Sequence, residues 1–262
     1  LALEPSFAMY PVYCQMFKAK YIPLKLKLSN DFDYFKELKK KIHEYRPKII
    51  SLANPNQPLE AMLKIDEIKT ILRIAKKIKS LVVIDEAYAH FNHVNTVPLI
   101  KDHNNLIVVR TFSKAFGLAG ARIGYTVANR KLISLLQSIK PIYEVNGVNT
   151  RIIEFFLKNI NIMKHHVDQI SKSRAYFKNF LKDFNIIMIG KFSNTVLFKL
   201  ESKRQVDIMV KKLYQKKYII RPMTIDGDDR YIRCTLGHVK TMKHFVKNMQ
   251  KVMKSKRFRE SI

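Results

Sequence analysis

Cysteine, glycine and tryptophan are scarce or missing in this chain of 262 residues. Tryptophan is absent, glycine occurs 7 times, and there are 2 cysteines, Cys14 and Cys234, far apart in the sequence. Two distant cysteines form neither a disulfide framework nor a metal-binding cluster, so a reducing, cytoplasmic location is expected. No apolar run is long enough to cross a bilayer, which predicts no membrane-embedded segment.

Acidic residues are also few. The chain has 21 Asp and Glu against 49 Lys and Arg, a formal net charge of +28. Such a surplus fits nucleic acid, an anionic membrane or phosphorylated substrates as partners. The alternative is a lysine-rich composition spread over every helix, which needs no charged partner. The chain has no RNP-like motif, zinc-finger spacing or low-complexity arm, so no specific nucleic-acid binding is predicted.

Apolar strands alternate with amphipathic helices in the first part of the chain. Strands are predicted over 21–28, 48–53, 81–84, 105–110 and 122–127, and helices over 33–45 and 60–79. This alternation predicts an α/β sheet buried on both faces. A mostly helical stretch runs to about residue 184, followed by strands over 186–189, 194–200, 218–221 and 231–236 and by helices over 203–216 and from 239. We therefore expect a large domain over 1–145 and a smaller C-terminal α/β domain over 146–262.

Polar residues follow three consecutive predicted strands. The loop ANPNQP (53–58) follows one strand, Asp85 and Tyr88 follow the next, and the segment Thr111-Phe112-Ser113-Lys114 follows the third. Ligands of open α/β sheets bind outside the carboxyl ends of the strands. These groups are therefore expected to line one site.

The segment TFSKAFGLAGARIGY (111–125) combines groups that suit a phosphate. Thr111 and Ser113 supply hydroxyl donors, and Arg122 supplies a planar guanidinium fork. Gly117 and Gly120 allow a close backbone approach or a positive φ. The alternative is an ordinary basic loop with turn glycines.

Asp85 ends an apolar strand, so it needs a cationic or hydrogen-bonding partner. It is either a helix cap or structural ion pair, or a carboxylate that faces the ring nitrogen of a ligand. A lysine for covalent attachment, a carboxylate for a pyridinium nitrogen, and hydroxyls with an arginine for a phosphate together indicate a pyridoxal-phosphate site. His165 and His166 are adjacent on a predicted helix and face different ways, so no metal site is predicted.

The segments VVIDEAYAHF (82–91) and VVRTFSKAFGLAGARIGY (108–125) resemble the core of fold-type I pyridoxal-phosphate enzymes. The likeness is greatest to the histidinol-phosphate aminotransferase branch of the class-II aminotransferases. The segments PSFAMY (5–10), ANPNQP, NTVLF (194–198) and YIRCTLGH (231–238) resemble further segments of the family in the same order. The resemblance implies a large domain with a mostly parallel sheet and flanking helices, here truncated, and a smaller C-terminal α/β domain.

The resemblance also implies roles for individual residues. Lys114 would be the catalytic lysine that holds the cofactor covalently. The other cofactor contacts would come from Phe7, Gln57, Asp85, Tyr88, Thr111, Ser113 and Arg122. Phe7 would stack on the ring, and Asp85 and Tyr88 would contact its nitrogen and its phenolic oxygen. Arg233 would bind the substrate carboxylate, with Asn194 lining the same site.

The sequence departs from the family pattern in several places. Gln57 replaces an asparagine, Leu59-Glu60 replaces Thr-Gly, and His238 replaces a threonine. Relatives also carry a long segment before PSFAMY, which includes a small-residue loop that cups the phosphate. We therefore expect the chain as given to be an incomplete fragment that is not competent alone.

The implied function is amino-group transfer between an amino acid such as glutamate and a keto or phosphorylated keto substrate such as imidazole acetol phosphate. The alternatives are an aminotransferase of a surface-polysaccharide or phosphonate pathway, a lyase that resembles threonine-phosphate decarboxylase, a basic nucleic-acid-binding protein on an old enzyme fold, or an inactive fragment. Small-molecule substrates and a homodimer are the expected partners. Arg221 is a further candidate for a substrate contact.

Overall fold

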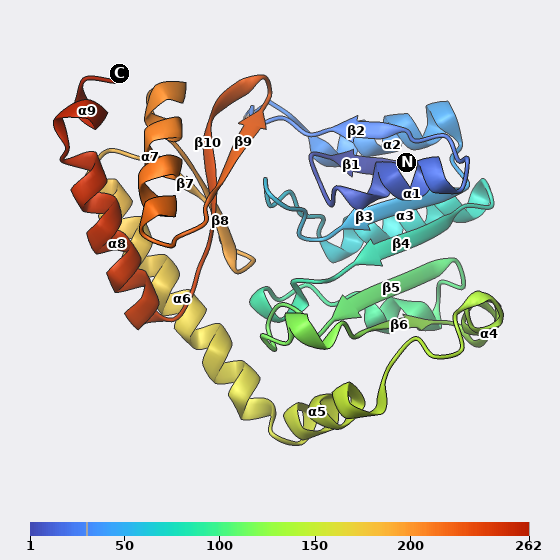
Figure 1. The fold of residues 1–262 in the computed structure, drawn as a ribbon. Coiled ribbons are helices and arrows are strands. Elements are labelled where there is room, and N and C mark those ends of the chain that lie inside the picture. Colours follow the sequence, from blue (N-terminus) through green and yellow to red (C-terminus); the bar gives the residue numbers. More distant parts are fainter. Residues whose placement is uncertain (30, 262) are drawn as a thin grey trace. The chain divides into compact units, whose positions relative to one another are not determined.

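The structure is a computed structural model that describes residues 1–29 and 31–261 (Figure 1). Its internal contacts divide the chain into two compact units, Leu1–Met163 and Lys164–Ile262. Helix α5 (Gly147–Lys158) thus groups with the first unit. The predicted domains over 1–145 and 146–262 stay a prediction.

A six-stranded sheet forms the centre of the first unit. Its strands are β1 (Ala2–Glu4), β2 (Pro23–Lys25), β3 (Ile49–Ala53), β4 (Leu81–Asp85), β5 (Leu106–Thr111) and β6 (Gly124–Ala128). They follow the order β2-β1-β3-β4-β5-β6, and all neighbours are parallel except β5 and β6. The predicted α/β sheet of mostly parallel strands is therefore confirmed.

Helices cover both faces of this sheet. They are α1 (Met9–Met16), α2 (Tyr34–Tyr45) and α3 (Ile65–Lys77). Because parallel crossovers are right-handed, α1 lies on the opposite face from α2 and α3, as the view in Figure 1 shows. The inward stripes of α2 and α3 are the buried Leu38, Ile42, Ile68, Ile71, Leu72 and Ala75.

The chain leaves β1 toward one edge of the sheet and leaves β3 toward the other. From β1 it continues through α1 to β2, whereas from β3 it continues through α3 to β4. Such a reversal is a topological switch point, where the crevice at the carboxyl ends of the strands accepts ligands. PSFAMY and ANPNQP leave the sheet on the two sides of this point.

Several element boundaries differ from the prediction. β1 and α1 were not predicted, because three residues of strand give too short a pattern to detect. Helix α3 begins at Ile65 and not at residue 60. The buried Asn54 side chain accepts a hydrogen bond from the Leu63 N–H and donates one to its carbonyl, so the segment before α3 stays a loop.

Short 3-10 turns and two helices complete the first unit. The turns are Ala89–Phe91, Val97–Lys101 and Ala119–Ala121, and the helices are α4 (Arg130–Ile139) and α5. The side chain of Asn129 caps α4 by accepting from the Leu132 N–H, and Asn146 caps α5 through Asn149 in the same way.

The second unit is built on a four-stranded antiparallel sheet. Its strands are β7 (Met188–Ile189), β8 (Thr195–Lys199), β9 (Arg221–Ile225) and β10 (Asp228–Thr235), in the order β7-β8-β10-β9. Its helices are α6 (Ile160–Lys182), which begins in the first unit, α7 (Lys203–Gln215), α8 (Val239–Met253) and α9 (Lys256–Arg259). The core centres on Phe177, whose ring contacts those of Phe198 and Phe245.

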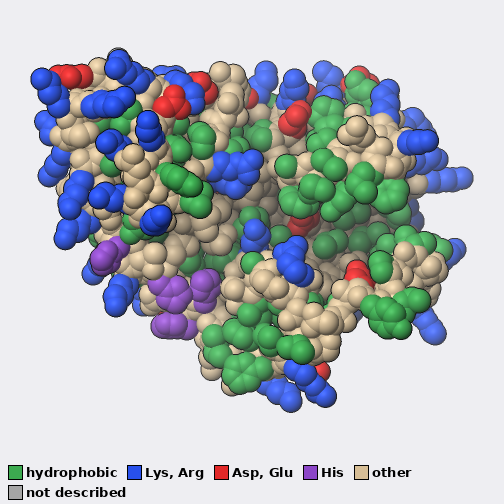
Figure 2. All heavy atoms as spheres, in the orientation of Figure 1, with side chains coloured by type: hydrophobic (Ala, Val, Ile, Leu, Met, Phe, Trp, Pro, Cys, Tyr) green, Lys and Arg blue, Asp and Glu red, His purple; other side chains and the backbone are tan. Residues whose placement is uncertain are grey.

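Positive charge is distributed widely over the surface. Figure 2 shows Lys and Arg side chains scattered over the face in view, with few acidic groups among them. Within the described residues, no helix has the length and apolar character that a membrane span requires.

Candidate active site

Asp85 is the last residue of β4, and both of its carboxylate oxygens have a protein donor. Oδ1 accepts from the Ala87 N–H at 2.9 Å, and Oδ2 accepts from the Tyr10 hydroxyl at 3.3 Å. Burial raises the pKa of the carboxyl, while these two donors and the charge of Lys114 act to lower it. An ionised carboxylate has about four lone-pair positions, so Asp85 retains acceptor capacity for a ligand.

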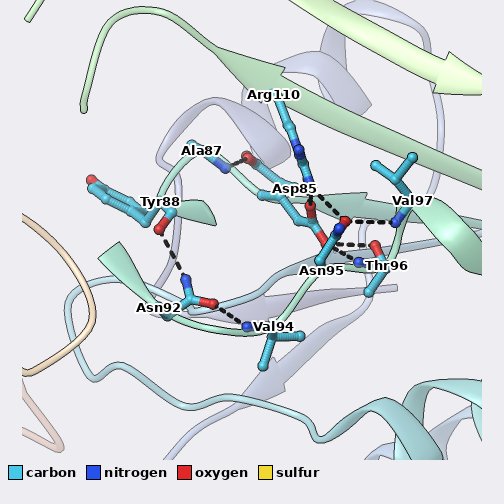
Figure 3. Close-up of polar contacts among 10 residues, drawn as sticks. Asp85, Ala87, Tyr88, Asn92, Val94, Asn95, Thr96, Val97 and Arg110 are labelled. Atoms are coloured by element: carbon cyan, nitrogen blue, oxygen red, sulfur yellow. Dashed lines mark hydrogen bonds and ion pairs between the residues drawn. The ribbon is translucent and has the colours of Figure 1, made fainter. Parts of the chain in front are cut away.

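A buried network of polar groups supports the turn that follows Asp85 (Figure 3). The fully buried carboxylate of Glu86 accepts from Arg110 Nε at 2.9 Å and from its terminal nitrogen at 2.6 Å. Its other oxygen accepts from the Thr96 N–H at 2.7 Å and from the Thr96 hydroxyl at 2.6 Å. Arg110 also donates to Asn95 Oδ1 at 2.7 Å. This network fixes β4, β5 and the 92–97 loop to one another.

Lys114 and Tyr88 meet beside Asp85. The Lys114 amine lies 5.4 Å from the centroid of the Tyr88 ring, and its charge interacts with Asp85. The Tyr88 carbonyl accepts from Asn92 Nδ2 at 2.9 Å, which anchors the tyrosine backbone. The three predicted residues therefore come together at the carboxyl ends of β4 and β5, as the sequence pattern required.

The loop between β5 and β6 carries the predicted phosphate donors. The Thr111 and Ser113 hydroxyls are 2.9 Å apart, and the Ser113 N–H donates to Thr111 Oγ1 at 3.0 Å. Phe112 pairs back to Ile123, so Arg122 lies near the same strand end, where it is exposed and donates to the Ala119 carbonyl at 3.1 Å. The loop turns at Gly117, whose φ of 70° favours glycine.

The segment after β1 completes the site. Phe7 is 54% exposed, and its ring forms a T-shaped pair with that of Tyr10, with the ring centroids 5.7 Å apart. The buried Asn56 donates to the Pro5 carbonyl at 2.8 Å and joins ANPNQP to this segment. Gln57 donates to the Glu60 carboxylate at 3.1 Å. Gln57 and Glu60, which both depart from the family pattern, are therefore in contact with each other.

The predicted substrate residues lie in the second unit. Arg233 is in β10, directly opposite Arg221 of β9, so both guanidinium groups leave the same face of the antiparallel pair. Like charges placed directly opposite are destabilising without an anion between them. Asn194 precedes β8, and its buried side-chain oxygen has no hydrogen-bond partner within the described residues. These groups suit an anionic substrate.

The residues of the first unit fit pyridoxal phosphate by their chemistry. They supply an amine, a buried carboxylate with free acceptor capacity, a phenol, paired hydroxyls beside a guanidinium, and an exposed aromatic ring. Each is a group that such a cofactor requires. The cavity of about 810 Å³ in this unit lies elsewhere, between β2 and α2, and none of the predicted site residues lines it.

Sequence reasoning missed three groups that shape the site. Tyr10 reaches Asp85, and Glu86 and Arg110 hold the turn that carries Asp85. The adjacent acidic pair Asp85-Glu86 at the end of a buried strand was the available signal, since a second buried carboxylate also needs a cation. Tyr10 is the last residue of PSFAMY, but its contact with Asp85 was missed because it depends on the path of a helix that was not predicted.

An α/β fold with this site at its switch point is that of a pyridoxal-phosphate enzyme of the aminotransferase type. The family "Aminotransferase class I and II" matches residues 1–249, and the chain belongs to this family.

Within this family, the chain is similar to histidinol-phosphate aminotransferases. The histidinol-phosphate aminotransferase of Thermoanaerobacter pseudethanolicus is 31% identical over 252 residues, which cover 95% of this chain and 70% of that protein. The crystal structure of the histidinol-phosphate aminotransferase from Clostridium acetobutylicum matches with a TM-score of 0.85 at 23% identity, covering 96% of this chain and 76% of the other. The crystal structure of the histidinol-phosphate aminotransferase from Sinorhizobium meliloti in complex with pyridoxal-5'-phosphate matches with a TM-score of 0.83 at 20% identity. The match covers 97% of this chain and 70% of the other.

Proposed function

We propose that this protein is a pyridoxal-phosphate-dependent aminotransferase that moves an amino group between an amino acid, such as glutamate, and a phosphorylated keto substrate such as imidazole acetol phosphate. The observation that carries the proposal is the meeting of Lys114, Asp85 and Tyr88 at the strand ends, next to the Thr111–Ser113 hydroxyl pair. Family membership and the relatives' activity support it.

The chain offers a holder for each part of the cofactor. Thr111, Ser113 and Arg122 would bind the phosphate, and Phe7 would cover the ring. Gln57 and Tyr88 would lie at the phenolic oxygen, although the bond between Gln57 and Glu60 must shift for this contact. The cofactor, when bound, supplies an electron sink for the carbanion at the substrate Cα.

The protein's own groups then have defined tasks. Asp85, ionised, would hold a proton on the ring nitrogen through a charge-assisted hydrogen bond. The amine of Lys114 would be the base that takes the proton from the substrate Cα.

The paired arginines support a substrate with a strong anionic group. Arg233 and Arg221 present two planar forks from one face, an arrangement that suits a carboxylate or a phosphate ester. This pairing fits both the carboxylate of an amino acid and the phosphate of a phosphorylated keto substrate. No observation favours the lyase or the surface-polysaccharide and phosphonate pathways. A homodimer is proposed from the resemblance to dimeric aminotransferases.

The test is the visible spectrum of the protein mixed with pyridoxal phosphate. We expect a band at roughly 400–430 nm, typical of the cofactor bound to a lysine, which is lost in Lys114→Ala and kept in the control Lys131→Ala. Amino transfer from glutamate to imidazole acetol phosphate should follow the same pattern. A band that persists in Lys114→Ala would show that another group holds the cofactor.

A further inference from the structure

Tyr10 connects two parts of the site that the family motifs treat separately. It lies in the first turn of α1, and its backbone N–H donates to the Phe7 carbonyl at 3.1 Å. Its ring meets Phe7 edge-on at 5.7 Å, and its hydroxyl donates to Asp85 Oδ2 at 3.3 Å. One residue therefore contacts both the aromatic that would cover the ring and the carboxylate that would hold the ring nitrogen.

The position of Tyr10 follows from the topology. The chain turns from β1 into α1 on one side of the switch point, while Asp85 ends β4 on the other. A side chain from α1 must cross the carboxyl edge of β3 to reach Asp85. Consistent with this path, Ser51 of β3 also acts on the Tyr10 hydroxyl and tends to lower its pKa.

The Tyr10 hydroxyl is a permanent donor. Burial raises its pKa far above the usual range of a tyrosine, and the neighbouring Asp85 charge raises it further. The phenol thus stays protonated at every physiological pH, and it cannot act as a base there. In its contact with Asp85 the phenol is therefore the donor and the carboxylate is the acceptor.

The Asp85 carboxyl needs such a donor. Burial is the largest influence on its pKa and raises it, and the nearby charge of Glu86 acts in the same direction. The Ala87 N–H, the Tyr10 hydroxyl and Lys114 oppose this rise. If Lys114 is engaged with a cofactor, as the proposed function requires, its positive charge no longer contributes in full, and the two neutral donors carry more of the task.

We propose that Tyr10 is a positioning residue that orients the Asp85 carboxylate toward the ring nitrogen of the cofactor and keeps it ionised, while its ring sets the angle of Phe7. This inference rests on the proposed function, because it assigns Asp85 to the cofactor. It adds a residue that acts through Asp85 and touches no reacting atom.

The test compares Tyr10→Phe, which removes only the hydroxyl, with Tyr13→Phe, an exposed tyrosine of the same helix. Tyr10→Phe should weaken pyridoxal-phosphate binding by roughly three- to tenfold, the usual range for one hydrogen bond. The pH at which the visible band of the holoenzyme changes on acidification should move upward, since Asp85 then protonates at higher pH. Tyr13→Phe should match the wild type in both measurements.

A double-mutant cycle separates positioning from general damage. In the Asp85→Asn background, Tyr10→Phe should have almost no further effect on cofactor affinity, because the contact is already altered. Equal losses in both backgrounds, or a Tyr10→Phe protein with wild-type affinity and pH profile, would overturn the inference. Thermal unfolding of each variant shows whether a loss comes from folding.

A second measurement does not depend on the cofactor. Carbon NMR of the aspartate carboxyls in the chain without pyridoxal phosphate, assigned with Asp85→Asn, gives the titration of Asp85 directly. Tyr10→Phe should raise its midpoint, and an unchanged midpoint would refute the contact. If wild-type protein shows no Lys114-dependent band, the proposed function fails, and this titration still decides whether Tyr10 keeps Asp85 ionised.

Discussion

Glu86 and Arg110 form the most deeply buried ion pair among the described residues. The Glu86 side chain is 0% exposed and that of Arg110 is 16% exposed, with donor and acceptor 2.6 Å apart. Taking both charges out of water is costly, and the pair is tolerated because Thr96 and Asn95 satisfy the remaining polar positions. Because Glu86 is next to Asp85, the pair also fixes the turn that carries the site.

Removing one partner of this pair should be strongly destabilising. Arg110→Ala leaves the Glu86 charge buried without a cation, so we expect the free energy of unfolding to fall by about 3–5 kcal/mol. Arg73→Ala is the control, because Arg73 is exposed and its side-chain hydrogen bond within the described residues goes to the Lys69 carbonyl of its own helix. Urea unfolding followed by circular dichroism measures both. A loss of less than about 1 kcal/mol in Arg110→Ala would mean that water reaches Glu86.

The sequence was informative about residues that follow a strand and much less about residues that reach the site from elsewhere. Asp85, Thr111 and Lys114 could be placed together because parallel strands end at one edge. Tyr10 could not be placed, because its contact depends on the position of a short helix after a strand of three residues. Gln57 was identified as unusual, but its bond to Glu60 depends on the fold of the loop.

At the scale of elements, the loop between β5 and β6 depends on its glycines in different ways. Gly117 adopts a φ of 70°, which a residue with a side chain rarely does. At Gly124 an added Cβ would lie 2.7 Å from the Arg110 carbonyl oxygen, closer than non-bonded atoms approach. At Gly120 nothing lies within 4 Å of such a Cβ. The sequence predicted that Gly117 and Gly120 allow a positive φ or a close approach to a ligand; Gly117 has the positive φ, and the tight contact at Gly124 is with strand β5.

This difference gives a matched pair of substitutions. Gly124→Ala should push β6 away from β5 and lower the free energy of unfolding by about 1–3 kcal/mol, as overpacking does. The same change should weaken pyridoxal-phosphate binding, because Thr111 pairs with Gly124. Gly120→Ala should leave stability and binding close to the wild type. Chemical unfolding and a cofactor titration give the result, and equal effects of the two substitutions would contradict it.

The bounds of elements with a clear hydrophobic periodicity could be predicted from the sequence. The bounds of elements that are set by turns could not. Helices α2 and α7 begin within a residue of the predicted start, because capping side chains of Asp33 and Ser202 precede an amphipathic run. The prediction for strand β9 was wrong, because the strand spans Arg221–Ile225 and not 218–221. It is set by the hairpin turn at Asp226 and Gly227, whose positive φ values give no hydrophobic pattern.

At the scale of the whole molecule, the charge of +28 makes the pH dependence unusual. Basic groups spread over the surface repel one another, and added protons increase the repulsion (Figure 2). Three histidines add to this sensitivity. Burial lowers the pKa of His90, His103 and His166, so each resists protonation in the folded state.

His166 provides the sharpest test of that sensitivity. Its Nδ1 lies 3.0 Å from Nε2 of His238, a hydrogen bond that needs at least one neutral ring, and burial, His238 and His165 lower its pKa. The unfolded chain, with a histidine pKa of about 6.5, binds the proton first. The stabilisation is therefore full above about pH 6.5 and is lost as the pH falls through the lower folded pKa.

We expect the free energy of unfolding to drop between about pH 7 and 5, and we expect His166→Gln to reduce the slope of the free energy of unfolding against pH. Urea unfolding in about 0.3 M salt, which screens the general repulsion, measures that slope. The exposed His43→Gln is the control, and equal slopes in the two variants would show that the His166–His238 contact does not contribute.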